Sequence, residues 1–134
     1  MLKKILSIFV LSCFLSPIAN AFDYAQCEKR ALPLGFDEVS KCKHSEMLIE
    51  QKKLQDLYDV LANDSEIKVL NKNDMKRMYD SWLFYRNSYC DMYTAAVTDS
   101  FSEKYNKEHC LLEHTRNARL YMQALIDNFY TDPD

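Results

Sequence analysis

The sequence predicts an all-α protein, a small disulfide-stapled antiparallel bundle of three main helices plus a short N-terminal helix. Three observations support this fold class. The chain between Ser45 and Tyr130 contains neither Pro nor Gly, which permits long helices. Apolar residues recur at steps of three and four residues in three successive stretches, as on one face of a helix. Finally, the cysteine content suits a small exported domain that is held together by disulfides.

The first 21 residues have the order of a secretory signal peptide. Lys3 and Lys4 give a positively charged start, and the apolar run 5–15 follows them. Ala19 and Ala21 form the small-x-small pattern that precedes a cleavage site, so we expect cleavage after Ala21. The apolar run is shorter than the roughly 20 residues that a stable membrane span needs. The sequence therefore predicts a periplasmic or secreted protein without a stable membrane span.

A bacterial lipoprotein is the alternative interpretation of the same leader. Val10-Leu11-Ser12-Cys13 loosely resembles a lipidation site, in which Cys13 would carry the lipid. The residues that follow, Phe14 and Leu15, are still apolar, whereas a lipidated chain more often becomes polar there. Cleavage after Ala21 is the favoured interpretation, and a retained membrane anchor is weaker than either.

Residues 22–134 form one predicted domain with an acidic balance. Of the 17 basic residues, Lys3 and Lys4 leave with the leader, so 15 basic residues face 20 acidic ones and the net charge is −5. Nucleic acid is a poor partner for such a domain, because phosphates need Lys and Arg. A basic protein partner is compatible with this charge. Gly35 is the only glycine, which excludes Gly-rich phosphate loops.

Four cysteines remain in the predicted mature chain: Cys27, Cys42, Cys90 and Cys110. An even number in an exported domain of this size predicts two disulfides, for which three connectivities are open. Cys27–Cys42 and Cys90–Cys110 are favoured because each pair brackets a plausible turn. Each would close a loop of about 15–20 residues and stabilise the domain by roughly 3 kcal/mol in the chain-entropy model.

The N-terminal third predicts two helices. A short helix over 24–31 is followed by a bend at 32–35, which contains Pro33 and Gly35. Ser45 has the character of a helix cap, and an amphipathic helix is expected from Ser45 to Ala62, ending at 63–65. Its apolar positions are Met47, Leu54, Leu57, Tyr58 and Leu61.

The middle of the chain predicts the next helix. Residues 66–70 are either helical or a connector, and Asn71 or Asn73 can cap a helix that runs to about Val97. We interpret its apolar and aromatic stripe as core packing rather than a ligand site. The stripe comprises Met75, Met78, Trp82, Tyr85, Tyr89, Met92, Tyr93 and Ala96.

The last part of the chain predicts a loop and a final helix. The mixed polar stretch Thr98–Asn106 is the expected loop, and the tail 131–134 is expected to fray. The helix between them carries one apolar side, made of Cys110, Leu111, His114, Ala118, Tyr121, Met122, Leu125 and Phe129.

Trp82, Arg86 and Cys90 stand four residues apart and so share one helical face. We expect Arg86 to stack on Trp82 or to pair with a carboxylate such as Glu113, with its stem covering apolar surface. A structural role for Arg86 is favoured over direct contact with a partner protein.

Metal binding and catalysis are both disfavoured by the sequence. Cys110 and His114, with His109 adjacent and Cys90 nearby, are groups that zinc uses, but an oxidising compartment favours the disulfide instead. The histidines, which include His44, lie in no recognisable nucleophile motif. The carboxylates are spaced as on a solvated helix face rather than as a glycosidase pair. We therefore expect a protein that is not an enzyme and binds no metal or cofactor, with a small hydrolase as the weaker alternative.

The order of these motifs resembles the LprI-like lysozyme-inhibitor family of small exported bacterial proteins. The resemblance rests on the four cysteines, on WLFYRNSYC from Trp82 to Cys90, and on Cys110-Leu111 followed by Thr115 and a nearby Arg. The chain departs from the family pattern at Tyr79, where the family has Gln, and at Ala118, where it has Arg. Arg116 and Arg119 flank that second position. The chain is thus similar to a divergent member.

The resemblance implies a structural motif of Trp82, Arg86, Thr115 and Arg119, and a protein partner that is a lysozyme-type muramidase. Exposed carboxylates or a protruding loop such as Thr98–Asn106 would fill or cover the sugar cleft of that enzyme. The alternative is an envelope antidote or effector that binds another protein and has no role toward lysozyme.

Overall fold

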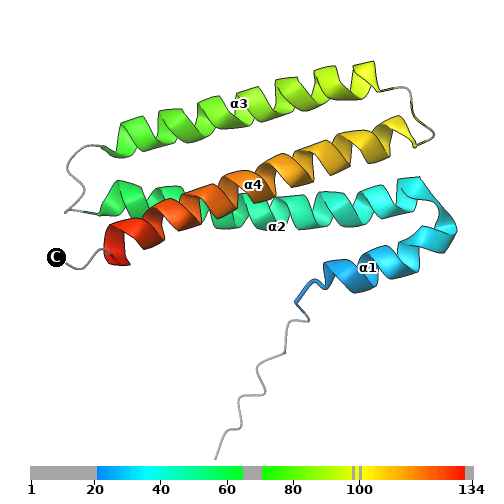
Figure 1. The fold of residues 1–134 in the computed structure, drawn as a ribbon, viewed down its shortest axis with the longest axis horizontal. Helices are drawn as coiled ribbons and strands as arrows, with labels where there is room; N and C mark the ends of the chain where they lie inside the picture. The colour runs from blue at the N-terminus through cyan, green and yellow to red at the C-terminus, as the bar shows by residue number, and fades with distance from the viewer. Residues whose placement is uncertain (1–20, 65–70, 98, 100, 132–134) are drawn as a thin grey trace, which may run out of the picture.

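The structure is a computed structural model, which describes residues 21–64, 71–97, 99 and 101–131, with side chains described up to Asn128. Within these residues it is an antiparallel helical bundle, as predicted (Figure 1). The predicted signal peptide with Cys13, the segment 66–70 and the end of the tail, 132–134, lie outside the described residues. The elements in chain order are α1 (Tyr24–Ala31), the 3-10 helix η1 (Leu32–Leu34), α2 (Phe36–Asn63), α3 (Lys72–Ala96) and α4 (Glu103–Thr131).

The first short helix lies where the sequence predicts it. The side chain of Asp23 caps α1 by accepting the backbone N–H of Gln26 at 3.0 Å. Pro33 lies within η1, and Gly35 then takes a φ of +106°, a conformation that L side chains rarely adopt. The chain reverses direction at this point, so α1 lies beside the first turns of α2 (Figure 1).

The predicted start of the first long helix is wrong, because α2 begins at Phe36 and not at Ser45. Ser45 lies inside the helix, and its hydroxyl donates to the carbonyl of Lys41 one turn earlier, at 3.1 Å. The extra turns contain buried polar residues, Ser40 and Lys43, which interrupt the apolar spacing on which the prediction depended.

The ends of α3 and α4 differ less from the prediction. Asn71, one of the two predicted caps, accepts the backbone N–H of Asp74 at 2.9 Å. The predicted loop Thr98–Asn106 is too long, because α4 begins at Glu103. The hydroxyl of Ser102 accepts the backbone N–H of Tyr105 at 3.1 Å, which caps this helix one turn before the predicted end of the loop.

Three apolar clusters form the core. One joins α1 to the start of α2, one surrounds Leu112, and one surrounds Leu54. A buried polar layer separates the last two. Between these levels lie buried Glu50, Arg86 and Thr115. The largest interface in the bundle joins α2 to α4, and α3 packs on these two helices through smaller interfaces.

The interpretation of the stripe on α3 as core packing holds for only part of the stripe. Met75 is buried, and Trp82 packs against the cluster around Leu54. Tyr85 and Met92, by contrast, are 58% and 64% exposed, and Met78 is also exposed. In Figure 1, α3 lies at the edge of the bundle, which leaves part of its surface open to solvent.

The favoured disulfide connectivity is confirmed. Cys27–Cys42 ties α1 to α2, and Cys90–Cys110 ties α3 to α4, with Cα–Cα distances of 5.8 and 5.7 Å. Two disulfides in so small a protein indicate an oxidising compartment, such as the periplasm or the cell exterior. None of the described helices combines the length and the apolar character that a membrane crossing requires.

Candidate protein-binding surface

The predicted motif residues gather around the guanidinium of Arg86, which is buried between the three long helices. Arg86 donates to Gln51 Oε1 at 2.9 Å, to Thr115 Oγ1 at 2.9 Å and to Asn87 Oδ1 at 2.9 and 3.1 Å. Its guanidinium carbon lies 5.1 Å from the centre of the Trp82 ring. This group therefore fixes the relative position of one side chain from each long helix.

The alternative pairing of Arg86 with Glu113 is wrong. Glu113 contacts Arg116 at 3.4 Å instead, and every described hydrogen-bond partner of Arg86 is uncharged. Burial lowers the pKa of Arg86 because it disfavours the charged form. Arginine keeps its charge in proteins even so, because its ordinary pKa exceeds about 12.

Arg119 is separate from the Arg86 group and contacts Glu50, which is nearly fully buried. Glu50 accepts from Arg119 Nε at 2.7 Å and from Lys53 Nζ at 2.8 Å. Burial acts to raise the pKa of Glu50, but the hydrogen bonds and positive charges of Lys53 and Arg119 outweigh it and hold the pKa below its usual value. Glu50 is thus a carboxylate at neutral pH, paired inside the bundle.

The groups that suggested a zinc site do come together in space. One ligand atom from each of Cys90, Cys110 and His114 lies within 4.8 Å of the others. Both sulfurs are joined in the disulfide, which leaves no thiolate for a metal ion while the bond is intact. The His114 ring packs against Tyr89, with ring centroids 4.7 Å apart.

The other two histidines lie in different surroundings. His44 contacts Glu108 at 3.1 Å across the interface of α2 and α4. His109 stacks near Tyr105, and its pKa is lowered by burial and by the nearby charge of Lys43. His109 and His114 line one shallow depression, whereas His44 lies apart from them beside Glu108.

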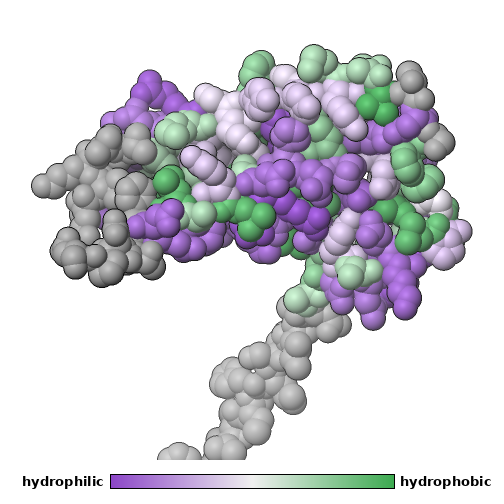
Figure 2. Space-filling view, viewed as in Figure 1, coloured by the Kyte–Doolittle hydropathy of each residue, from purple (hydrophilic) through white to green (hydrophobic). Residues whose placement is uncertain are grey.

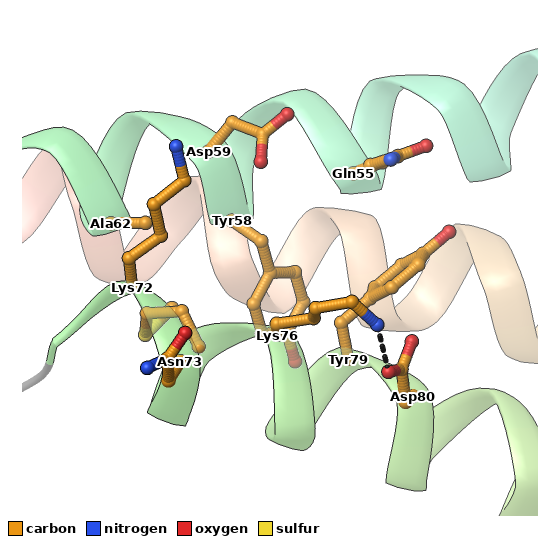
Figure 3. Close-up of a pocket in the computed structure, with 10 residues that line it drawn as sticks. Gln55, Tyr58, Asp59, Ala62, Lys72, Asn73, Lys76, Tyr79 and Asp80 are labelled. Atoms are coloured by element: carbon orange, nitrogen blue, oxygen red, sulfur yellow. Dashed lines mark hydrogen bonds and ion pairs between the residues drawn. The ribbon is translucent and has the colours of Figure 1, made fainter.

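A pocket of about 280 Å³ lies between the last turns of α2 and the first turns of α3. Figure 3 shows the rings of Tyr58 and Tyr79 at its centre, 5.4 Å apart between centroids. Lys76 and Asp80 form an ion pair at its rim, as drawn in Figure 3. Its described lining contains no Ser, Thr, Cys or His, so it offers no usual catalytic nucleophile or base of those types.

Exposed apolar side chains gather beside η1 and the start of α4, at the end of the bundle opposite the pocket. We call Leu32, Leu34, Phe36 and Phe101 the bundle-end surface; they are 57%, 73%, 39% and 40% exposed. Leu34, Phe36 and Phe101 together line a shallow depression. Figure 2 shows hydrophobic patches at this end of the molecule, where η1 and the start of α4 lie.

Aromatic contacts hold the bundle-end surface in place. The ring of Phe36 meets Phe101 edge-on at 4.6 Å and Tyr105 at 5.2 Å. Beneath them the ammonium of Lys43 lies 5.0 Å from the Tyr105 ring and donates to the Tyr24 hydroxyl at 3.0 Å. Burial acts to lower the pKa of Lys43, but the contacts with Tyr24, Tyr105 and Glu28 outweigh it and raise the pKa, so Lys43 stays charged.

Carboxylates flank the apolar residues of this surface. Asp37 directly follows Phe36, and Asp99 and Glu103 are both within two residues of Phe101; all three are exposed. Asp99 also orders the chain here, because its Oδ1 accepts the backbone N–H of Phe101 at 3.0 Å and the side chain of Asn106 at 2.9 Å. The result is an apolar surface with acidic edges on a rigid support.

Sequence reasoning missed Gln51 and the bundle-end surface. Nothing in the spacing of α2 distinguishes Gln51 from its exposed neighbours. A signal for the surface was present, however, in the bend 32–35, because turns are usually polar and this one carries Leu32 and Leu34. Apolar residues at an exposed turn are a more specific sign of binding than apolar residues in a helix.

Comparison of the chain with protein-family models, with curated proteins and with solved structures finds no match.

Proposed function

We propose that this protein is an exported protein-binding domain that inhibits lysozyme-type muramidases. The observation that carries the proposal is the bundle-end surface, a rigid apolar surface edged by Asp37, Asp99 and Glu103. The resemblance of the segment around Trp82 and Arg86 to the LprI-like family supplies the class of target. The two disulfides support a role outside the cytoplasm, where such an enzyme acts.

The chemistry of the surface suits the cleft of a basic glycosidase. Leu34 and Phe36 offer apolar contact to the wall of a sugar-binding cleft. The neighbouring carboxylates would pair with basic residues at the rim of the cleft, which favours fast and specific association. Occupying the cleft denies the polysaccharide access to the catalytic carboxylates of the enzyme.

The test is lysozyme-driven clearing of a cell-wall suspension, followed by turbidity with and without the exported chain. We expect clearing to slow at micromolar concentrations of the chain, and the double variant Leu32→Ser/Leu34→Ser to lose most of this effect. Leu120→Ser is the matched control, because Leu120 is also an exposed leucine but lies on α4. Unchanged clearing with several lysozyme types would overturn the proposal and would favour another protein target, such as a toxin or a host protein.

A further inference from the structure

The outer face of α3 carries an uncharged stripe that is largely exposed to solvent. Between Asp80 and Asp91 the only charged residue is Arg86, which is buried. Phe84 and Tyr85, in the middle of this segment, are 75% and 58% exposed. In Figure 2 pale and green surface follows the upper edge of the molecule, over α3. Monomeric proteins rarely leave such a helix face open to solvent.

The stripe alternates large and small side chains with a seven-residue period. The large residues are Met78, Tyr85 and Met92, and the small ones are Ser81, Ser88 and Ala95; all six are exposed. Their steps of three and four residues place them in one row, like the a and d positions of a coiled coil. Such a row can pack against a second helix.

This alternation is self-complementary when two copies of α3 run antiparallel. Met78 then lies opposite Ala95 of the second copy, Tyr85 opposite Ser88, and Met92 opposite Ser81. Each large side chain meets a small one, so the two helices can approach closely. Because the pattern is the same when read from either copy, the contact closes with two-fold symmetry and does not propagate.

The alternation also selects the antiparallel orientation. In a parallel pair in the same register, Met78, Tyr85 and Met92 would each meet the same large residue of the second copy. The large side chains would then hold the two helices apart, and the small residues would face one another across a gap.

We infer that the protein forms a two-fold symmetric homodimer through the outer face of α3. The row from Met78 to Ala95 covers 18 residues, and its ends are about 26 Å apart at 1.5 Å per residue step. One helix pair of this length lies at the low end of specific interface sizes, so the dimer dissociates at micromolar concentrations. The inference is independent of the proposed function, because the bundle-end surface does not overlap this face.

Sedimentation equilibrium of the exported chain, from about 5 to 500 µM, tests this interface over the concentrations at which such a dimer dissociates. We expect a monomer–dimer equilibrium that Ser88→Arg weakens by about tenfold or more, because a long charged side chain replaces a small one at the centre. Asn117→Arg is the matched control: it adds the same charge at an exposed position on α4 and leaves the dimer unchanged.

The orientation is tested by exchanging a large and a small residue that lie opposite each other. Ser88→Tyr alone weakens the dimer, because it meets Tyr85 of the second copy, and Ser88→Tyr combined with Tyr85→Ser restores it only in the antiparallel pair. A chain that stays monomeric at every concentration overturns the inference, and so does a dimer that is equally stable in Ser88→Arg. Weakening by Asn117→Arg to the same degree would place the interface elsewhere and overturn it as well. Circular dichroism of each variant shows that the helices are intact.

Discussion

Arg86 is a buried cation that is held by uncharged acceptors from all three long helices and by the ring of Trp82. The planar guanidinium is well suited to this position, because it presents several donors in fixed directions. Its removal would leave the Gln51 carbonyl without its donor, while the Thr115 hydroxyl would keep its bond to the Leu111 carbonyl at 2.6 Å. The shape of this group therefore matters as much as its charge.

Arg86→Lys should lower the free energy of unfolding by about 1–3 kcal/mol, because one ammonium cannot reach Gln51, Thr115 and Asn87 together. Urea denaturation followed by circular dichroism measures the change. Arg77→Lys is the control: it makes the same substitution on the same helix at an exposed position, and it should change stability little. Equal effects of the two variants would mean that the buried hydrogen bonds of Arg86 contribute nothing specific.

Glu50→Gln should destabilise the protein at neutral pH by about 1–3 kcal/mol, because Arg119 and Lys53 lose a buried charged acceptor. The pKa of Glu50 is lowered in the folded state, so its contribution is complete above the unfolded-state pKa of about 4.3 and is lost as the pH falls through the folded value. The difference between wild type and variant should therefore shrink below about pH 4.

Denaturation curves at several pH values measure this difference. Glu38→Gln, at a surface carboxylate paired with Lys41, is the control, and it should change stability little at any of these pH values. A Glu50→Gln difference that stays constant from neutral to acidic pH would contradict the lowered pKa.

The helices illustrate which parts of the fold the sequence could predict. The period of apolar residues located α3 and the body of α2 and α4, because many of the same residues lie in the apolar clusters between these helices. It missed the first turns of α2, where Lys43 is buried by its contacts with Tyr24 and Tyr105 rather than by apolar character. A polar residue that is buried through distant partners looks exposed in a local pattern.

Removing the Cys90–Cys110 disulfide with Cys90→Ala/Cys110→Ala should lower the free energy of unfolding by about 3 kcal/mol. The bond closes a loop with a sequence separation of 20 residues and ties down α3, which otherwise packs through the smaller interfaces. We expect guanidinium denaturation to show a lower midpoint.

Cys27→Ala/Cys42→Ala is the comparison. This bond fastens α1 to α2, so its loss should free mainly α1, seen as faster amide hydrogen exchange in 24–31 than in α3. The Cys27→Ala/Cys42→Ala variant could instead lose protection from hydrogen exchange throughout α3 and α4, as much as Cys90→Ala/Cys110→Ala does. That result would refute a local role for the Cys27–Cys42 bond.

At the scale of the whole molecule, the bundle-end surface unites two segments that are distant in the chain. Phe36 and Phe101 are 65 positions apart, yet their rings lie 4.6 Å from each other. The sequence alone predicted a bend at 32–35 and a loop at 98–106, and it gave a binding role only to the loop. It could not pair them, because their contact depends on how α2 and α4 pack. The face of α3 was hidden for a similar reason, since an aromatic stripe looks the same whether it is buried or exposed.

The net charge gives the proposed inhibitor a measurable signature. Residues 22–134 carry 15 basic and 20 acidic side chains, a net charge of −5, and three of the carboxylates edge the bundle-end surface. Attraction to a basic lysozyme should speed association, and salt should screen it. We expect the association rate constant to fall by about tenfold between about 0.05 and 0.5 M NaCl, measured by surface plasmon resonance.

Two variants separate the electrostatic from the apolar contribution. Asp37→Asn/Glu103→Gln should flatten the salt dependence of association, because both carboxylates are at the edge of the surface. Leu34→Ser should leave that dependence intact and act mainly by faster dissociation, since an apolar anchor contributes after encounter. Two results would contradict this division of roles between the acidic edge and the apolar centre. One is an association rate constant that does not change with salt, and the other is a salt dependence that disappears in Leu34→Ser.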